Sequence, residues 1–299
     1  MSEPSVSIAQ KSRIRISLAA MPPWLLVLLA VLSVQTGAAV AKQLFDVTGP
    51  GGVVFLRTSL ASVLFFALWR PKIRGYRPQD YLVITIYGLT IAAMMLFFYA
   101  AISRVPLGIT VAVAFVGPLG IAVVGSRRRS DLLWVALAAG GIILLSPLTG
   151  VSLDLPGLLL AFLSAVGWAV FILLTGRVSR TFPASEGLAI AMAIAAVVSI
   201  PFGLVGAVKV LPSLSLMALG IVVAVLSSAI PFGFEFEALK HLPAPVYGVL
   251  TSLEPVVAVL VGFIVLHEAL GLREIAGIVM VTVAAAATAR ASSQTAATV

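Results

Sequence analysis

The sequence predicts an all-α integral membrane protein with ten transmembrane helices, arranged as two inverted five-helix repeats with both termini cytoplasmic. Three observations predict this fold class. Of the 299 residues, 61% are hydrophobic and only 10% are charged, and the mean hydropathy of +1.17 is far above what a soluble core requires. Uncharged runs of similar length recur along the chain, and Lys and Arg gather in alternate loops between them.

The first five helices follow from the first set of uncharged runs. A bilayer core takes about 20 apolar residues per helix, and the runs Val105 to Ser126 and Leu132 to Leu153 are 22 residues each. The second helix is expected to start at Pro50-Gly51-Gly52. The first resembles a secretory signal because Ala39-Val40-Ala41 ends it, but its apolar run is too long for one. After a cytoplasmic segment, residues 1–20, we expect spans at 24–41, 50–69, 81–102, 105–125 and 132–149.

The second five helices follow in the same way. The runs Leu155 to Gly176 and Gly187 to Val208 are again 22 residues each, and Glu254 has 12 uncharged residues on either side. The short tail at 291–299, rich in Ala, Ser and Thr, is expected to be a disordered cytoplasmic segment. The predicted spans are 156–176, 187–208, 213–236, 243–266 and 271–289.

Basic residues fix the orientation, because cytoplasmic loops of membrane proteins carry an excess of Lys and Arg. With the N-terminus inside, the inner segments hold 14 of the 19 Lys and Arg. The outer segments hold four, Lys42, Arg104, Lys209 and Arg273, and Arg57 lies within a span. This distribution also accounts for the net charge of +8 without a nucleic-acid partner.

A faint internal repeat relates the two sets of five spans. Pro118 of the fourth span aligns with Pro255 of the ninth at an offset of 137, and Gly37-Ala38-Ala39-Val40 matches Gly167-Trp168-Ala169-Val170 at an offset of 130. Because five is odd, the second copy enters the membrane with the opposite orientation. We therefore predict two inverted repeats, related by an axis in the membrane plane, at residues 21–150 and 151–290.

Glu254 lies at the centre of the ninth span and is followed by Pro255. A carboxylate at this depth costs roughly 2.5–3.5 kcal/mol on insertion scales, so it normally faces protein or a water-filled cavity. Pro255 removes a backbone donor and opens the helix, and Gly117-Pro118 is the matching interruption in the fourth span. Transporters built from inverted repeats place their substrate site near such interruptions. We expect Gly117, Pro118 and Pro255 to act as hinges; the alternative is that each proline is a tolerated kink.

Several short segments occur in a characteristic order along nearly the whole chain. They are Gly37-Ala38-Ala39-Val40-Ala41-Lys42, Phe55-Leu56-Arg57, Val105-Pro106-Leu107-Gly108, Phe115-Val116-Gly117-Pro118-Leu119, Leu253-Glu254-Pro255 and His267-Glu268. Together they resemble the EamA branch of the drug/metabolite transporter superfamily, and within it the threonine/homoserine and aromatic amino-acid exporters. The resemblance implies an inner-membrane carrier that exports small amino acids or related metabolites through a central cavity between two EamA-like halves.

The chain departs from this family pattern in two places. The threonine/homoserine exporters tend to carry an acidic residue at the position of Ala114 and an Asn-Tyr pair at Met95-Leu96. We therefore expect a less polar pocket that favours neutral or hydrophobic amino acids such as methionine, threonine, leucine or phenylalanine. The alternatives are a carrier for another small metabolite or drug, and a channel.

Side chains for the cavity are chosen by their depth in the predicted spans. Met95 and Trp168 fall near mid-membrane, where an indole N–H needs a partner that lipid cannot supply. Glu254 could carry a proton, hold the ammonium group of a substrate, or only join helices by hydrogen bonds. The alternative for the aromatic residues is lipid-facing packing. The predicted lining residues are Glu254, Trp168, Met95, Tyr99, Phe98, Tyr87 and Glu235.

Two cations near the outer surface are expected to be structural or gating charges. Lys42 ends the first span, and Arg57 lies about two turns inside the second at 1.5 Å per residue. Arg57 can extend outward to the interface. His267-Glu268, at the outer boundary of the ninth span, is expected to cap the helix rather than bind a metal.

The sequence lacks the characteristic features of several other classes of protein. No G-x-x-x-x-G-K-[ST] phosphate loop occurs, so ATP is not an expected partner. The chain has no cysteine and two histidines, His241 and His267, which the topology places near opposite membrane faces. A channel filter motif is also missing. We expect no enzyme activity, cofactor or metal; the expected partners are amino-acid substrates and the lipid bilayer, with the chain a monomer or weak homodimer.

Overall fold

The computed structural model describes residues 21–124, 131–145, 154–239, 241–242, 247 and 250–296, and their regular secondary structure is helical. The helices of the first half are α1 (Pro23–Lys42), α2 (Phe45–Trp69), α3 (Pro78–Ile102), α4 (Leu107–Ala114), α5 (Val116–Val124) and α6 (Asp131–Leu145). Those of the second half are α7 (Leu155–Val178), α8 (Ala184–Val208), α9 (Leu214–Ala224), the π-helical turn η2 (Val225–Ala229), α10 (Ile230–Leu239), α12 (Glu254–Leu266) and α13 (Leu272–Ala296).

Six helical stretches are long and apolar enough to cross a membrane, and two shorter apolar helices accompany them. The six are Pro23–Lys42, Phe45–Trp69, Pro78–Ile102, Leu155–Val178, Ser185–Val208 and Leu214–Glu235, and the shorter two are Leu107–Ile121 and Glu254–Leu266. The prediction of a helical membrane protein is thereby confirmed. The number of ten spans, their inverted arrangement and the cytoplasmic termini stay predictions.

Two boundaries differ most from the sequence prediction. The second helix begins at Phe45 rather than Pro50, and a kink at Gly49, whose φ is +68°, separates its first turn from the rest. Glycine adopts this left-handed conformation without the steric cost that a side chain would bring. At the other end of the chain, α13 continues to Ala296, so residues 291–296 of the segment predicted to be disordered are helical. Alanine has the highest helix propensity, and the alanines of this tail favour that continuation.

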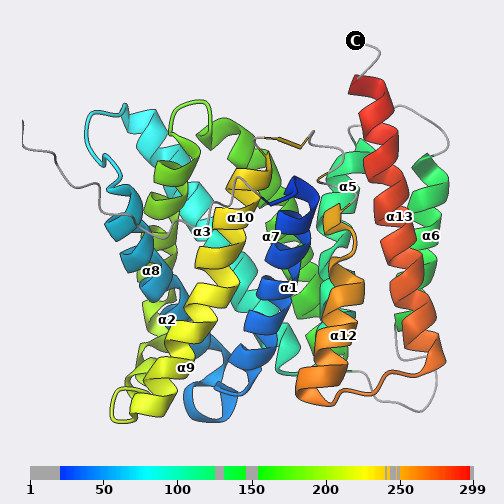
Figure 1. The fold of residues 1–299 in the computed structure, drawn as a ribbon, viewed down its shortest axis with the longest axis horizontal. Helices are drawn as coiled ribbons and strands as arrows, with labels where there is room; N and C mark the ends of the chain where they lie inside the picture. Colours follow the sequence, from blue (N-terminus) through cyan, green and yellow to red (C-terminus); the bar gives the residue numbers. More distant parts are fainter. Residues whose placement is uncertain are drawn as a thin grey trace, which may run out of the picture.

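The helices lie side by side with their long axes roughly parallel (Figure 1). The pair α6 and α13 packs at one end of the molecule, and α2, α8 and α9 pack at the other. Between them, α1 contacts α10 and α12, and α4 lies against α12 and α7. Elements from both halves of the sequence therefore meet in the middle of the protein.

Glycines bring two helix pairs into backbone contact. A Cβ atom at Gly206 of α8 would lie 1.9 Å from the Thr48 carbonyl oxygen of α2, and one at Gly117 of α5 would lie 2.1 Å from the Ala165 carbonyl oxygen of α7. Association of helices in lipid depends on such small residues, because lipid is as apolar as the side chains it would replace. The glycines thus serve close helix contact.

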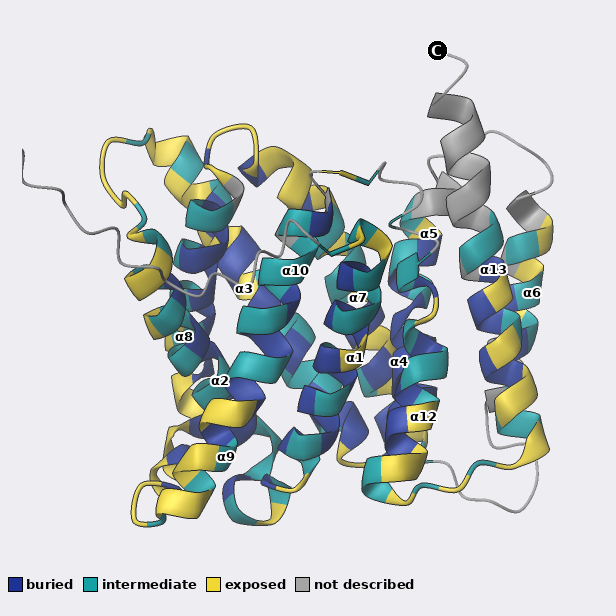
Figure 2. Ribbon diagram, viewed as in Figure 1, coloured by how far each residue is buried: buried dark blue, intermediate teal, exposed yellow. Residues whose placement is uncertain are grey.

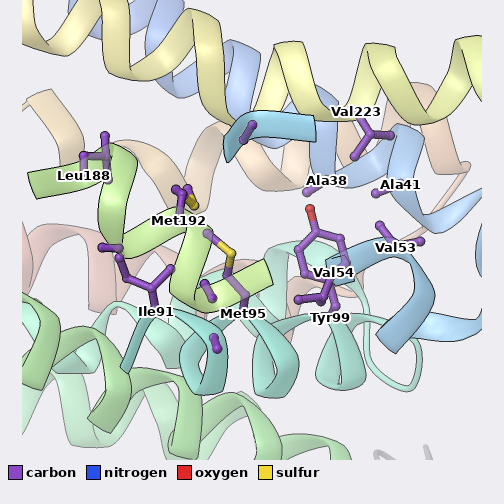
Figure 3. Packing of buried hydrophobic residues seen from close by; sticks show 14 of the residues in the cluster. Ala38, Ala41, Val53, Val54, Ile91, Met95, Tyr99, Leu188, Met192 and Val223 are labelled. Atoms are coloured by element: carbon purple, nitrogen blue, oxygen red, sulfur yellow. The ribbon is translucent and has the colours of Figure 1, made fainter. Parts of the chain in front are cut away.

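Exposed and buried residues divide as expected for a protein in lipid (Figure 2). Large apolar side chains such as Val63, Val205, Leu214 and Phe263 are more than half exposed on the outer surface. Inside, one large cluster unites α1, α2, α3, α8 and α9. Figure 3 shows part of this cluster, with Met95 and Tyr99 of α3 surrounded by residues from the other helices.

Candidate functional site

Arg57 forms the first polar centre of the protein interior. It is half-buried, and its three guanidinium nitrogens donate to three acceptors from two other elements. Nε donates to Ser228 Oγ at 3.2 Å, one Nη to the Tyr99 hydroxyl at 3.2 Å and the other to the Ser227 carbonyl oxygen at 2.6 Å. The guanidinium carbon also lies 5.8 Å from the centre of the Tyr99 ring. These contacts join α2 to α3 and η2.

The π-helical turn η2 supplies two of these acceptors. A π turn replaces the i→i+4 hydrogen bonds of an α-helix by wider ones, is rare, and often marks a functional site. Side chains from α1 and α2 bind its backbone: Ser33 Oγ donates to the Leu226 carbonyl oxygen at 2.7 Å, beside the Ser227 carbonyl that Arg57 contacts. The Ser227 hydroxyl is buried and has no hydrogen-bond partner among the described residues.

Glu235, Tyr247 and Glu254 form the second polar centre. The Tyr247 hydroxyl donates a hydrogen bond to the Glu235 carboxylate, and Glu254 is close enough to interact electrostatically with both. All three side chains are half-buried. The structure thus brings together Glu235 and Glu254, two predicted cavity residues. Glu235 lies seven residues after Ser228, about 10 Å along the helix. The segment from η2 to α10 therefore contributes residues to both centres.

The helix is interrupted just before Glu254. Ser252 and Leu253 form a turn, Leu253 is the N-cap residue, and α12 starts at Glu254 with Pro255 in its first turn. Proline cannot donate to the carbonyl four residues earlier, and it fits the first turn of a helix, where no donor is needed. A carboxylate at this end also interacts favourably with the helix dipole.

A matching interruption occurs in the first half. α4 ends at Ala114 and α5 begins at Val116, so the break at Phe115 lies just before Gly117-Pro118. Pro118 has no N–H for the carbonyl of Ala114, which accounts for the position of the break. Both predicted hinge segments therefore coincide with breaks in the helices, while a hinge motion stays a prediction.

At the helix ends that the sequence predicts to face outward, Glu268 joins three elements. One carboxylate oxygen accepts from Lys42 Nζ at 2.5 Å, and the other accepts from the backbone N–H of Leu107 at 2.9 Å. Lys42 ends α1, Leu107 begins α4 and Glu268 follows α12. We call this contact the outer latch. The sequence placed Lys42 and Glu268 at the outer boundary, but not in contact with each other.

The predicted aromatic residues separate into two groups. Tyr87, Met95 and Tyr99 are buried in the large core cluster, and Phe98 packs against Tyr99 with ring centres 5.8 Å apart. Trp168 lies elsewhere: it meets Phe115 edge-on at 5.5 Å and packs in a small cluster with Val281 of α13. These positions are inside the protein and not among its large exposed apolar residues.

Sequence reasoning missed four polar residues of the protein interior. Tyr247 lies seven residues before Glu254, and the Ser227-Ser228 pair is set in an otherwise apolar span. Gln35 of α1 is only 2% exposed, and its side-chain oxygen has no partner among the described residues. A search for polar residues within the predicted spans would have found each of them.

Glu237, two residues after Glu235 in α10, pairs with His241 at 3.6 Å. The described part of the chain holds no group of three or more His, Cys, Asp or Glu residues that could bind a metal ion.

Comparison with known proteins identifies the family of this chain. Residues 155–290 match the EamA-like transporter family. The chain is 40% identical to the threonine/homoserine exporter RhtA of Salmonella typhimurium over 250 residues, 83% of this chain and 84% of that protein. It is 39% identical to RhtA of Escherichia coli over 259 residues, 85% and 88% of the two chains. A crystal structure with 19% identity and a TM-score of 0.60, covering 88% of this chain and 95% of that one, shares the fold. The chain belongs to the EamA-like transporter family, and it is accordingly a transporter rather than an enzyme and a multi-pass protein of the inner membrane.

Proposed function

We propose that this protein exports small neutral amino acids, with threonine and homoserine as the first candidates, by alternating access through a central site. The observation that carries the proposal is the 40% identity to a threonine/homoserine exporter along 84% of that protein's length. The interior holds two charged centres, one cationic and one acidic, and charged residues within membrane spans commonly mark substrate pathways.

The proposed architecture is ten spans in two inverted repeats, residues 21–150 and 151–290, with both termini cytoplasmic. Matching contacts in the two halves support it. Ser33 of α1 donates to the Leu226 carbonyl oxygen at 2.7 Å, and Ser164 of α7 donates to the Met94 carbonyl oxygen at 3.1 Å. These serines are 131 positions apart, close to the offset found in the sequence.

Helix pairs repeat in the same way. α1 contacts the α9–α10 segment and α12, while α7 contacts α3 and α4. In the proposed repeat, α7 is the counterpart of α1, α3 is the counterpart of α9–α10, and the α4–α5 segment is the counterpart of α12. These contacts of α1 therefore have equivalents for α7, which is the pattern that a twofold axis between the halves would produce.

The substrate site is proposed to include the acidic centre, with Glu254 as the group that binds the ammonium of the substrate or a proton. Glu235 and Tyr247 lie beside it. From the predicted lining set, Tyr99, Phe98, Met95 and Tyr87 are proposed to shape the adjoining apolar side, while Trp168, packed against Phe115, lies toward α13.

Alternating access is proposed to use the breaks before Pro118 and Pro255 as hinges. Helix interruptions of this kind concentrate bending at a few residues. The outer latch ties Lys42 and Leu107 of the first half to Glu268 of the second, so it would hold the outer side closed. Opening to the outside would then require the latch to separate.

Counterflow in proteoliposomes tests the proposed function. Vesicles loaded with unlabelled threonine should accumulate labelled threonine, homoserine or methionine, and should exclude aspartate and lysine. Exchange of aspartate or lysine without exchange of any neutral amino acid would contradict the substrate class. Measurement with and without a pH gradient shows whether protons are coupled to export.

Glu254→Gln separates the two roles of this carboxylate. If Glu254 binds the substrate ammonium or a proton, the variant should exchange threonine at least about tenfold more slowly, because a charged hydrogen bond is lost. The matched control is Asp46→Asn, an exposed carboxylate of α2 that belongs to neither centre. Unchanged rate and pH dependence in Glu254→Gln would leave Glu254 with a structural role only.

A further inference from the structure

Arg57 lies inside a membrane span without a compensating anion. Its contacts are a serine hydroxyl, a tyrosine hydroxyl and a backbone carbonyl, all of them neutral. Among the residues that the structure describes, no carboxylate lies within salt-bridge distance of its guanidinium. Asp46, the acidic residue of the same helix, lies eleven positions earlier, on the other side of the kink at Gly49.

A cation in this position is costly unless its charge is met. Buried charges in proteins are paired or bind an ion, since neutral hydrogen bonds replace only part of the lost hydration. An anchoring role at the membrane surface, which the sequence suggested, would direct the guanidinium outward to water. The structure directs it inward instead, to Tyr99 of α3 and to η2.

The guanidinium also keeps unused donors. Arginine has five N–H groups in a planar fork, and three hydrogen bonds hold this one in place. The side chain is half-buried, so part of its surface stays accessible. An arginine fixed by its neighbours and left with two free N–H groups is preorganised to bind a carboxylate.

A second observation at the same place indicates a ligand. The Ser227 hydroxyl is only 1% exposed and has no hydrogen-bond partner among the described residues, although the carbonyl of the same residue contacts Arg57. A Cβ atom at Gly37 of α1 would lie 2.2 Å from this hydroxyl oxygen. Unpartnered buried polar atoms are rare in native proteins, and each calls for an explanation such as a functional role or a bound water or ion.

We propose that Arg57, held by Tyr99 and Ser228, binds the α-carboxylate of the transported amino acid. This assignment rests on the proposed function, and it makes Arg57 a substrate-binding residue rather than an anchor or gate. The α-carboxylate of the substrate then supplies the anion that Arg57 lacks among the described residues. Recognition of the carboxylate also explains how one site could accept several neutral side chains, because every α-amino acid presents the same group.

The test compares threonine with threonine amide, in which a neutral carboxamide replaces the carboxylate. Unlabelled competitors are titrated against counterflow of labelled threonine in proteoliposomes. For the wild-type protein, threonine amide should compete at least tenfold more weakly than threonine. In Arg57→Gln, threonine itself should bind at least tenfold more weakly, and the preference for threonine over the amide should fall close to one. Arg104→Gln is the control, since Arg104 pairs with Asp154 at the exposed outer surface.

Further variants keep the test decisive if Arg57→Gln does not fold. Arg57→Lys keeps the charge but not the fork, and Tyr99→Phe removes only a hydroxyl that holds the guanidinium. Both should reduce the preference for threonine over its amide several-fold. A preference equal to that of the wild-type protein in folded Arg57 variants would overturn the proposal.

A binding measurement separates this proposal from the proposed function. Threonine should raise the unfolding temperature of the purified wild-type protein, and it should do so much less for Arg57→Gln. If the wild-type protein exchanges threonine and Arg57→Gln exchanges it equally well, the carboxylate site is wrong while export stands. If no amino acid is exchanged or stabilises the wild-type protein, the function is wrong. Stabilisation by chloride as strong as that by threonine would identify a site for small inorganic anions and overturn the assignment.

Discussion

Replacing Glu268 should weaken the outer latch in two separable steps. The Glu268 carboxylate accepts one hydrogen bond from Lys42 at 2.5 Å and another from the Leu107 backbone at 2.9 Å. Glu268→Gln removes the charge but keeps an oxygen that can accept from Leu107. Glu268→Ala removes both contacts and leaves the Leu107 N–H without its partner.

The burial of the pair sets the size of the effect. A hydrogen bond between charged groups contributes about 1.5–3 kcal/mol. The side chains of Lys42 and Glu268 are 26% and 14% exposed, so water screens part of the interaction and we take the lower end, roughly 1.5 kcal/mol. The bond to the Leu107 N–H adds about 1 kcal/mol. Glu268→Gln should therefore lose about 1.5 kcal/mol of unfolding free energy, and Glu268→Ala about 2.5 kcal/mol.

Denaturant titration in mixed micelles measures both losses. Asp46→Asn, at an exposed position with no salt bridge among the described residues, should change the unfolding free energy by less than about 0.5 kcal/mol. A double-mutant cycle with Lys42→Met should give a coupling free energy of roughly 1.5 kcal/mol. A coupling below about 0.3 kcal/mol, or equal losses for Gln and Ala at position 268, would refute the reasoning.

Two further predictions concern helix packing and pH. Gly206→Ala should destabilise the protein by 1–3 kcal/mol, as overpacking typically does, because the new Cβ would lie 1.9 Å from the Thr48 carbonyl oxygen; Gly176→Ala, which meets nothing within 4 Å, should be neutral or stabilising by up to about 1 kcal/mol in the same titration. Burial and the neighbouring Glu186 carboxylate raise the pKa of Tyr76 above its ordinary value, so folding favours its neutral phenol. This contribution is complete below the ordinary tyrosine pKa and is lost as pH rises through the raised pKa. Tyr76→Phe should therefore reduce the loss of stability above about pH 10, and an unchanged alkaline profile would count against this role of Tyr76.

The positions of the apolar helices were readable from the sequence because bilayer thickness sets their length. Uncharged runs of about 20 residues predicted each of the six long helices to within a few residues. Where a prediction missed a boundary, local chemistry explains it, as at Gly49, where a left-handed residue lets the chain add a turn before Pro50.

The contacts of the site were beyond the reach of sequence reasoning. Arg57 meets Ser228 across 171 positions, and Lys42 meets Glu268 across 226. Hydropathy gives the depth of a residue but not the helix face that it occupies. Hydropathy therefore predicts a structural or gating charge that can extend outward, although the packing of α2 against α3 and η2 turns the Arg57 guanidinium toward the interior.

In the proposed repeat, only one of the two helix breaks carries an acidic residue. In the first half, α5 touches α7 backbone to backbone, since a Cβ atom at Gly117 would lie 2.1 Å from the Ala165 carbonyl oxygen. Offsets of 137 and 130 assign Glu254 and Gln35 as the counterparts of these two residues. Where the α5–α7 interface has a tight apolar contact, the α12–α1 interface therefore holds a carboxylate and a buried amide whose oxygen lacks a partner among the described residues. A symmetric pair of breaks can move both halves alike, but only the break in the second half carries a group that can bind a proton or an ammonium, so substrate binding is expected to bias one hinge and not the other.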